Sequence, residues 1–463
     1  MSMDIKNLIK APTAYVFRRA FVKRRDAVTG LFESNWQDIS SEVKSYGKVT
    51  NQIDSARRNK FTFGNLKLTV SNEDGAFSPH DTPSSMWYGY LNQQRSLVKI
   101  EAGFVYPLKD ANGVYTNVEF PNQAITGTST VVNTSVTCSV FMGLISGDIP
   151  LSDKNEISFN VKPLVSVFQD FPARNLTGWT STGLTASQFV TMLRDQTDGA
   201  GGFVFRHFFG STTTNWDLST TSNVFANLNA ATAAAVVDKN AWEIVESLSE
   251  AENFVPFVTR EGIFKFISRD AIAATSLFEF HGSGSFSGEY GQTIKAVSSY
   301  GFRVSKYYSR VQIKWNAAAT STSYEVVEST LTVSGVSNPW VLGARTLALE
   351  NLYIQTSTVA NALAQTIFND VSALKREIEF TTTFVPHLGL FDRFSISYDP
   401  SNAQPNSYWD SNNWPADATD ADTDLILDDG AGDALVLNGA EFKFLSFELD
   451  LDNFSNKFLA REV

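Results

Sequence analysis

Short runs in which apolar and polar residues alternate recur near both ends of this 463-residue chain. They constrain its fold more than any other feature, because successive side chains of a β-strand point to opposite faces. Residues 61–70 follow this pattern if a bulge at Gly64 and Asn65 resets the face. Residues 97–104 and 309–315 alternate without interruption. The alternation therefore predicts half-buried sheets in both terminal thirds of the chain.

The composition agrees with a folded, β-rich protein. Aromatic residues make up 13% of the chain, and 36 of the residues are phenylalanine, a type that favours pleated, half-buried surfaces. Hydrophobic residues at 43% and charged residues at 19% are typical of a globular protein and exclude a disordered chain.

The middle of the chain has a different pattern. Residues 185–194 and 241–251 carry apolar side chains at helical spacing, with Thr185 or Ser187 as N-cap of the first helix and Asp238 or Asn240 as N-cap of the second. Two short predicted strands follow. A Gly/Ser-rich stretch at 281–291 is typical of a linker.

The predicted fold class is therefore mainly β with an α+β middle, and the length is compatible with about three domains. The first domain spans residues 1–170 and contains an inserted polar hairpin at about 105–140. The middle α+β domain spans 171–290. The last domain spans 291–463 and contains one helix, at 357–375, and an acidic loop at about 400–440.

Several kinds of chemistry are not supported by the residues. The single cysteine, Cys138, cannot form an internal disulfide or a cysteine-based metal site, and the four histidines show no paired spacing. Phosphate-binding loops, dinucleotide fingerprints and the GxSxG motif are absent. We expect no cofactor and no catalytic role.

The sequence has neither the apolar region of a signal peptide nor a membrane-spanning segment, so we expect synthesis in the cytoplasm.

The acidic loop is the best candidate for a metal site. Asp420, Asp422 and Asp424 match the first three ligand positions of a calcium-binding EF-hand loop. That loop also requires glycine where Leu425 stands and a bidentate glutamate where Ala431 stands. The EF-hand interpretation therefore fails, and the alternatives are a looser Ca²⁺ site or a solvated acidic loop.

Two tryptophans in the same region are a candidate glycan site. Trp409 and Trp414 lie among asparagines and Asp410, a mixture that can stack against a sugar ring and orient it. The favoured interpretation is that these rings pack beneath a surface loop. A glycan-binding adhesin is the alternative function, and a polysaccharide-degrading enzyme is a weaker one, because no spacing selects a pair of carboxylates.

The charge is unevenly distributed. The net charge is −12, yet residues 1–60 hold 12 Lys/Arg against 6 Asp/Glu, and residues 401–463 hold 3 against 13. A dense basic cluster comprises Arg18, Arg19, Lys23, Arg24 and Arg25. The overall charge disfavours general nucleic-acid binding. We interpret the basic cluster as a salt-bridged interface with an acidic neighbouring protein.

Three passages of the sequence resemble the tail hub proteins of bacteriophages. The first is residues 49–74 (VTNQIDSARRNKFTFGNLKLTVSNED), which look like early barrel strands. The second runs from residues 97–104 (LVKIEAGF) through 141–161 (FMGLISGDIPLSDKNEISFNV). The third is the terminal hairpin at 442–463 (FKFLSFELDLDNFSNKFLAREV).

The resemblance implies a structural hub in a tail tip or baseplate, located in the virion. It implies two tail-tube-like β-barrels flanking the mixed middle domain. Three chains would form a homotrimer whose six barrels adapt a six-fold tube to a three-fold tip around the DNA channel. The implied partners are the tail tube or distal tail protein, the tape-measure protein, spike or fibre subunits, and DNA that passes without specific binding. The family carries no catalytic residues, and its role lies in host cell entry and genome ejection.

Overall fold

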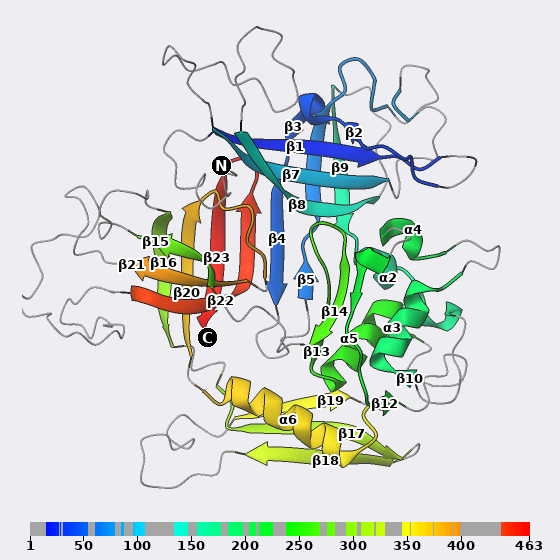
Figure 1. Ribbon diagram of the computed structural model, residues 1–463, viewed down its shortest axis with the longest axis vertical. Coiled ribbons are helices and arrows are strands. Elements are labelled where there is room, and N and C mark those ends of the chain that lie inside the picture. The colour runs from blue at the N-terminus through cyan, green and yellow to red at the C-terminus, as the bar shows by residue number, and fades with distance from the viewer. Residues whose placement is uncertain are drawn as a thin grey trace, which may run out of the picture.

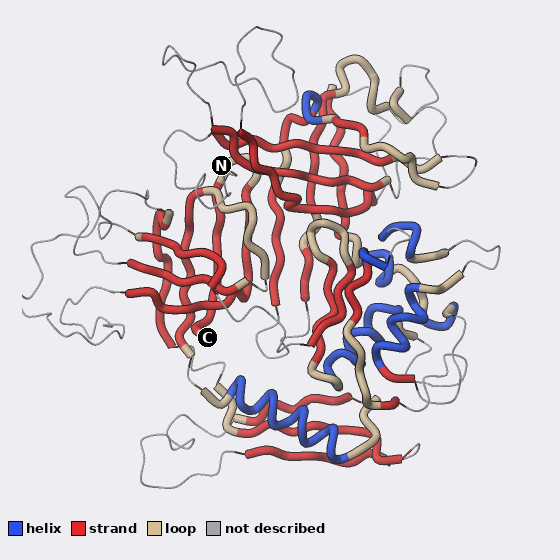
Figure 2. The backbone as a smooth tube through the Cα atoms, viewed as in Figure 1, coloured by secondary structure: helices blue, strands red, loops and turns tan. Residues whose placement is uncertain are grey.

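The structure of the chain is a computed structural model (Figure 1). It describes residues 15–26, 28, 31–53, 61–78, 85–87, 96–106, 134–146, 155–176, 184–197, 203–209, 213–225, 238–268, 276–282, 293–302, 307–318, 321–328, 345–351, 353–373, 375–390, 392–398 and 437–463. These residues form a mainly β structure with helices in the middle part of the chain (Figure 2). The predicted mainly β class is thereby confirmed.

The N-terminal third forms most of a seven-stranded antiparallel sheet. Its strand order is β2-β1-β7-β8-β9-β6-β3. The strands are β1 (Tyr15–Lys23), β2 (Gln37–Asp38), β3 (Val43–Ser45), β6 (Leu66–Ser71), β7 (Leu97–Tyr106), β8 (Thr134–Ser146) and β9 (Glu156–Pro163). The predicted polar hairpin at 105–140 lies largely outside the described residues, because β7 ends at Tyr106 and β8 begins at Thr134.

The C-terminal part of the chain forms most of an eight-stranded sheet with the path β15-β21-β22-β23-β20-β16. The strands are β15 (Ser276–His281), β16 (Ile294–Phe302), β20 (Arg376–Thr383), β21 (Arg393–Tyr398), β22 (Leu437–Asp450) and β23 (Ser455–Glu462). Its two outer strands approach each other, because the Thr293 N–H donates to the His281 carbonyl at 2.9 Å. The sheet therefore curls towards a half-barrel.

Two strands from the N-terminal third complete this second sheet. The arm formed by β4 (Lys48–Ile53) and β5 (Phe61–Phe63) leaves the first sheet after β3 and returns to it at β6. Strand β4 pairs with residues 446–450 of β22, directly beyond the stretch that pairs with β21. Strands β21 and β4 thus lie one after the other along the same edge of β22. At the junction between them, the pairing of β22 with β23 on the opposite edge has a register shift between Phe444 and Ser446.

This arm corrects the prediction for residues 61–70. The alternation is present, but Gly64 and Asn65 mark a crossing from the eight-stranded to the seven-stranded sheet and not a bulge within one strand. The two glycines at the corners of the arm explain how the chain crosses. Gly47 has a φ of +70°, and a side chain at Gly64 would overlap Thr50 of β4. Strand β15, predicted within the middle domain, also belongs to the eight-stranded sheet.

The predicted helices of the middle part are confirmed. Helix α3 (Ala186–Arg194) begins at Thr185, whose hydroxyl accepts from the Gln188 N–H in a capping box, and α5 (Ala241–Ala251) begins at Asn240. Strands β11 (Trp216–Leu218), β13 (Phe254–Val258) and β14 (Phe264–Ser268) form a small sheet beside them. The short helices α2 (Ser166–Gln169) and α4 (Arg206–Phe209) border it.

An insertion between β16 and β20 forms a further three-stranded sheet. It contains β17 (Arg310–Ala318), β18 (Ser321–Glu328), β19 (Thr346–Asn351) and helix α6 (Ser357–Val371), which lies over one face (Figure 1). Buried Val311 and Ile313 of β17 share a hydrophobic core with α5 and the other middle helices. The insertion therefore packs with the middle part of the chain, although the strands that flank it belong to the eight-stranded sheet.

The two large sheets share one continuous hydrophobic core. Ala20 and Val98 from the seven-stranded sheet and Phe380 and Phe458 from the eight-stranded sheet are all fully buried members of it. The rings of Phe104 and Phe384 meet between the sheets, with centroids 6.1 Å apart. Burial of apolar surface from both ends of the chain therefore stabilises one joint body. The boundaries of independent domains stay a prediction.

We predict that Gly47→Ala destabilises the protein. A Cβ at residue 47 would lie 2.7 Å from the Lys67 carbonyl oxygen, and its φ of +70° strains any L side chain. We expect a loss of about 1–3 kcal/mol in the free energy of unfolding, measured by chemical denaturation. Gly389→Ala is the matched control, because the nearest atoms to its Cβ are 3.7 and 3.8 Å away. Equal unfolding midpoints for the two variants would contradict the prediction.

Candidate functional site

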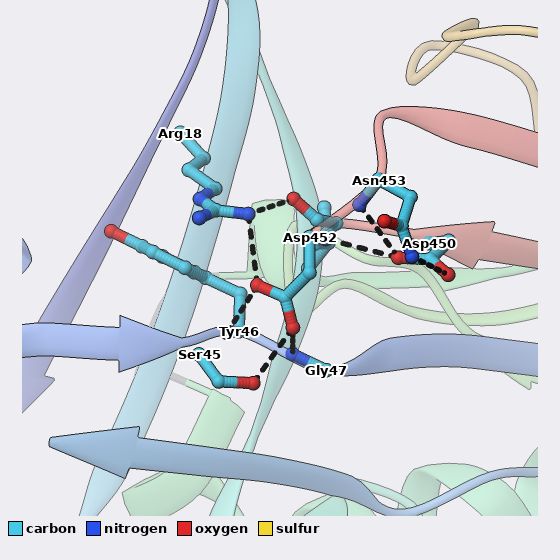
Figure 3. A network of polar contacts seen from close by, with 8 residues as sticks. Arg18, Ser45, Tyr46, Gly47, Asp450, Asp452 and Asn453 are labelled. Carbon is cyan, nitrogen blue, oxygen red and sulfur yellow. Dashed lines mark hydrogen bonds and ion pairs between the residues drawn. The ribbon is translucent and has the colours of Figure 1, made fainter.

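The most elaborate polar site in the described residues lies where the two large sheets meet (Figure 3). It joins β1 and the β3–β4 corner of the N-terminal third to the turn between β22 and β23. We call this site the sheet clasp and define it as Arg18, Ser45, Tyr46, Gly47 and Asp452, with Asp450 and Asn453 supporting the turn.

Asp452 is the centre of the sheet clasp. Its carboxylate accepts hydrogen bonds from the Ser45 hydroxyl at 2.7 Å, the Tyr46 N–H at 2.9 Å and the Gly47 N–H at 3.0 Å. Arg18 Nη1 donates to Asp452 Oδ1 at 2.9 Å and also to the Leu451 carbonyl. Burial raises the pKa of Asp452, but these hydrogen bonds and the charge of Arg18 outweigh it and lower the pKa below its ordinary value.

The position of Arg18 follows from strand alternation. Arg18 pairs with Ala102 of β7 and lies on the same face of β1 as Ala20 and Val22, both fully buried in the core. A cation on this face needs an acceptor where the core ends. Its guanidinium also stacks on the Tyr46 ring at 4.4 Å from the centroid and lies 5.1 Å from that of Phe454. Burial raises the pKa of Tyr46 to about 12, so this ring remains neutral.

The turn that carries Asp452 is held by a second carboxylate. Asp450 Oδ1 accepts from the N–H groups of Asp452 at 3.0 Å and Asn453 at 2.9 Å. Phe454 closes the turn with a φ of 48°, and its ring packs against Phe384. Lys48 lies 2.6 Å from Glu448 and 3.4 Å from Asp450 across the β4–β22 pair. These contacts hold the turn in the shape that presents Asp452 to the β3–β4 corner.

A second joint fixes the middle part of the chain against both sheets. The tight turn between β13 and β14 places Arg260 where its guanidinium donates to the carbonyls of Pro386 and His387. On its other side, the Ser139 hydroxyl of β8 donates to the Arg260 carbonyl at 2.7 Å. A cavity of about 330 Å³ lies beside this joint, lined in part by Asn51, Phe63, Phe257, Leu390, Asp392 and Phe447.

Burial changes the pKa of a thiol and of a carboxyl group near this joint. Burial raises the pKa of the Cys138 thiol to about 11, so the thiol stays protonated at neutral pH. Burial also raises the pKa of Asp392, whose carboxylate accepts from the Gly389 N–H at 2.7 Å. Within the described residues no group of three or more His, Cys, Asp or Glu could hold a metal ion. The hydrogen bonds of Arg260 hold the β13–β14 turn against strand β8 and against the segment that contains Pro386 and His387.

The predicted interface of the basic cluster with an acidic neighbouring protein is wrong for three of its members. Three of its arginines form ion pairs within this chain: Arg18 with Asp452, Arg19 with Asp38 and Arg24 with Glu33. Lys23 lies 5.7 Å from the centroid of Trp36. The sequence carried no signal that pointed to the acceptor of Arg18.

The other predicted sites fall outside the described residues. The calcium candidates Asp420, Asp422 and Asp424 and the glycan candidates Trp409 and Trp414 all lie between residues 401 and 436. Both assignments therefore stay predictions. None of the helices in the described ranges is long and apolar enough to cross a membrane.

Comparisons with known proteins find similar structures. No family model and no curated protein matches the sequence. A tail protein from Neisseria meningitidis aligns with 96% of this chain and 96% of its own, at 8% identity and a TM-score of 0.49. The 43 kDa tail protein of prophage MuSo2 from Shewanella oneidensis aligns over 96% and 98%, at 11% identity and a TM-score of 0.46. The prophage tail protein gp18 from Listeria monocytogenes aligns over 96% and 94%, at 7% identity and 0.44. All three of these proteins are tail proteins by name.

We predict that Asp452→Asn weakens the joint between the sheets in a pH-dependent way. The amide removes the charge and points a donor at other donors, and with 32% of the carboxylate side chain exposed we expect a loss of about 1–2 kcal/mol at pH 7. The contribution of a carboxylate with a lowered pKa is complete above its ordinary value of 3.8 and is lost as the pH falls below it. The difference between variant and wild type, measured by chemical denaturation, should therefore shrink towards pH 3.

Asp38→Asn is the control for this prediction. Asp38 also has a lowered pKa, but its partners Arg19 and Ser40 belong to the same end of the chain. We expect a smaller loss, because the Asp38 side chain is 40% exposed and exposed ion pairs contribute about 0–1 kcal/mol. A loss for Asp452→Asn that stays the same from pH 7 to pH 3 would show that its charge has no role.

Proposed function

We propose that this chain is a structural protein of a phage or phage-derived tail, and specifically the hub of a tail tip or baseplate. The observation that carries the proposal is the joining of two large sheets into one body by the β4–β5 arm and the sheet clasp. A hub subunit must hold two sheet domains at a fixed angle, and directional hydrogen bonds from a carboxylate do this. The strand passages that resemble tail hub proteins lie in these same sheets.

In the proposed assembly each of the two large sheets acts as one tail-tube-like barrel. The middle part of the chain lies between the two barrels in sequence. The contact between Thr293 and His281 supports closure of the C-terminal sheet. Three copies would place six such units around a channel, which adapts a six-fold tube to a three-fold tip. The protein acts there by contact and not by catalysis.

The proposed location is the virion tail tip, after synthesis in the host cytoplasm. The neighbours would be the tail tube or distal tail protein, the tape-measure protein and spike or fibre subunits. A net charge of −12 suits a wall past which DNA moves without binding, because it repels phosphate groups. The hub would thereby take part in host cell entry and genome ejection.

We predict that the purified full-length chain forms a homotrimer, alone or with its tube-side neighbour. Light scattering coupled to size-exclusion chromatography should give three times the mass of the 51.1 kDa chain for the protein alone, or three copies of the chain in the complex with the neighbour. Duplex DNA added at physiological salt should not co-elute with it, because few phosphate contacts can form on an acidic surface. A stable monomer under all conditions would count against the hub.

A further inference from the structure

The small sheet of the insertion has one covered face and one open face. Val311, Ile313 and Trp315 of β17 are buried in the core that includes residues of α6. The register places Tyr324 opposite Lys314 and Val326 opposite Gln312, on the other face. There the Tyr324 residue is 53% exposed and Val326 is 38% exposed. Two large apolar side chains, at positions i and i+2 of the same strand, are therefore exposed to solvent on one face.

The two edges of this sheet differ. Strand β19 is tied to the middle part of the chain, because Asn351 Nδ2 donates to the Ser247 carbonyl of α5 at 2.7 Å. Strand β18 ends the strand order on the other side, and among the described elements none lies beyond it (Figure 1).

Natural sheets usually protect an exposed edge with charged side chains, lysine above all, or with proline, a bulge or a very short strand. Strand β18 has 8 residues, STSYEVVE, without lysine or proline. Its register with β17 shifts only near the turn, between Asn316 and Ala318, and the charge that it carries at Glu325 is acidic. Such an edge disfavours another acidic strand but leaves backbone groups for a strand that carries cations.

The charges on β18 argue against a second copy of this chain as the added strand. An antiparallel pairing that sets Tyr324 opposite Val326 of the second copy also sets Glu325 opposite its own equivalent. A parallel pairing in register brings the same two carboxylates together. Like charges directly opposite on neighbouring strands are destabilising, so both of these registers are disfavoured, whereas a segment that carries cations would meet Glu325 with the opposite charge.

We propose that β18 binds an extended segment of a partner protein as an additional strand, and that apolar residues alternate with lysine or arginine in this segment. Backbone hydrogen bonds would supply affinity, and alternate side chains would supply specificity. The apolar residues would pack beside Tyr324 and Val326. The cations would lie on the opposite face beside Glu325, which pairs with Ile313 in the register and has no ion-pair partner among the described residues. This proposal does not depend on the homotrimer.

The test measures binding of defined peptides to the full-length chain by fluorescence anisotropy. The probe is a labelled synthetic peptide of about nine residues in which valine and lysine alternate, a length typical of a strand. The control peptide has the same composition with its lysines grouped at one end. We expect saturable binding of the alternating peptide and at least about tenfold weaker binding of the control, because only alternation places all valines on one face.

A pair of variants locates the binding site. Val326→Lys should weaken binding of the alternating peptide at least about tenfold, since it places a charge in the apolar contact and on the edge itself. Ala348→Lys is the matched control, because Ala348 is exposed in the same cross-strand row on β19, with Gln312 between the two positions. It adds the same charge at the opposite edge and should leave binding unchanged.

A charge exchange tests the specificity. Glu325→Lys should reverse the preference, so that a peptide alternating valine and glutamate binds this variant better than the lysine peptide does. The proposal is overturned if the alternating and grouped peptides bind equally, if Val326→Lys and Ala348→Lys have the same effect, or if no saturable binding is found.

Discussion

The arrangement of this molecule depends on the unfinished edge of one long strand. Strand β22 has 14 residues, whereas its neighbour β21 has only 6 and pairs with the first half of it. The second half, residues 446–450, needs partners for its backbone N–H and C=O groups, and β4 supplies them. This pairing brings the N-terminal third of the chain onto the C-terminal sheet. The corner at Gly47, the sheet clasp and the shared core all follow from it.

The grouping of the buried residues follows from the same exchange of strands. One core lies between the two large sheets and takes residues from both ends of the chain. The other joins the middle helices to the insertion at β17–β19, although that insertion interrupts the eight-stranded sheet. Each core thus unites segments that are distant in sequence. Loosening either should affect more than one sheet, because packed interiors transmit strain.

The sequence predicted the features that depend on neighbouring residues. The helix at 241–251 was predicted, with its cap narrowed to Asp238 or Asn240, because helical spacing and capping are local, and the structure has Asn240 as the cap. The terminal hairpin, β22 and β23, was found because its strands alternate around a polar turn. The crossing at Gly64 was missed, since a bulge and a change of sheet leave the same alternation. The contact between Arg18 and Asp452 spans 434 residues, and no periodic pattern can indicate such a pair.

The chemistry of the clasp explains why polar groups stand at the rim of an otherwise apolar joint. The hydrophobic effect is strong but has no direction, so two apolar sheet faces could slide or rotate on each other at a small cost in free energy. Asp452 accepts from two successive backbone N–H groups, a hydroxyl and a guanidinium, and few orientations satisfy all four donors. The core therefore supplies the stability of the joint, while the clasp sets its angle. In a ring of repeated subunits an error in that angle would add up from one subunit to the next, so the angle is the property that a subunit of the proposed kind most needs to fix.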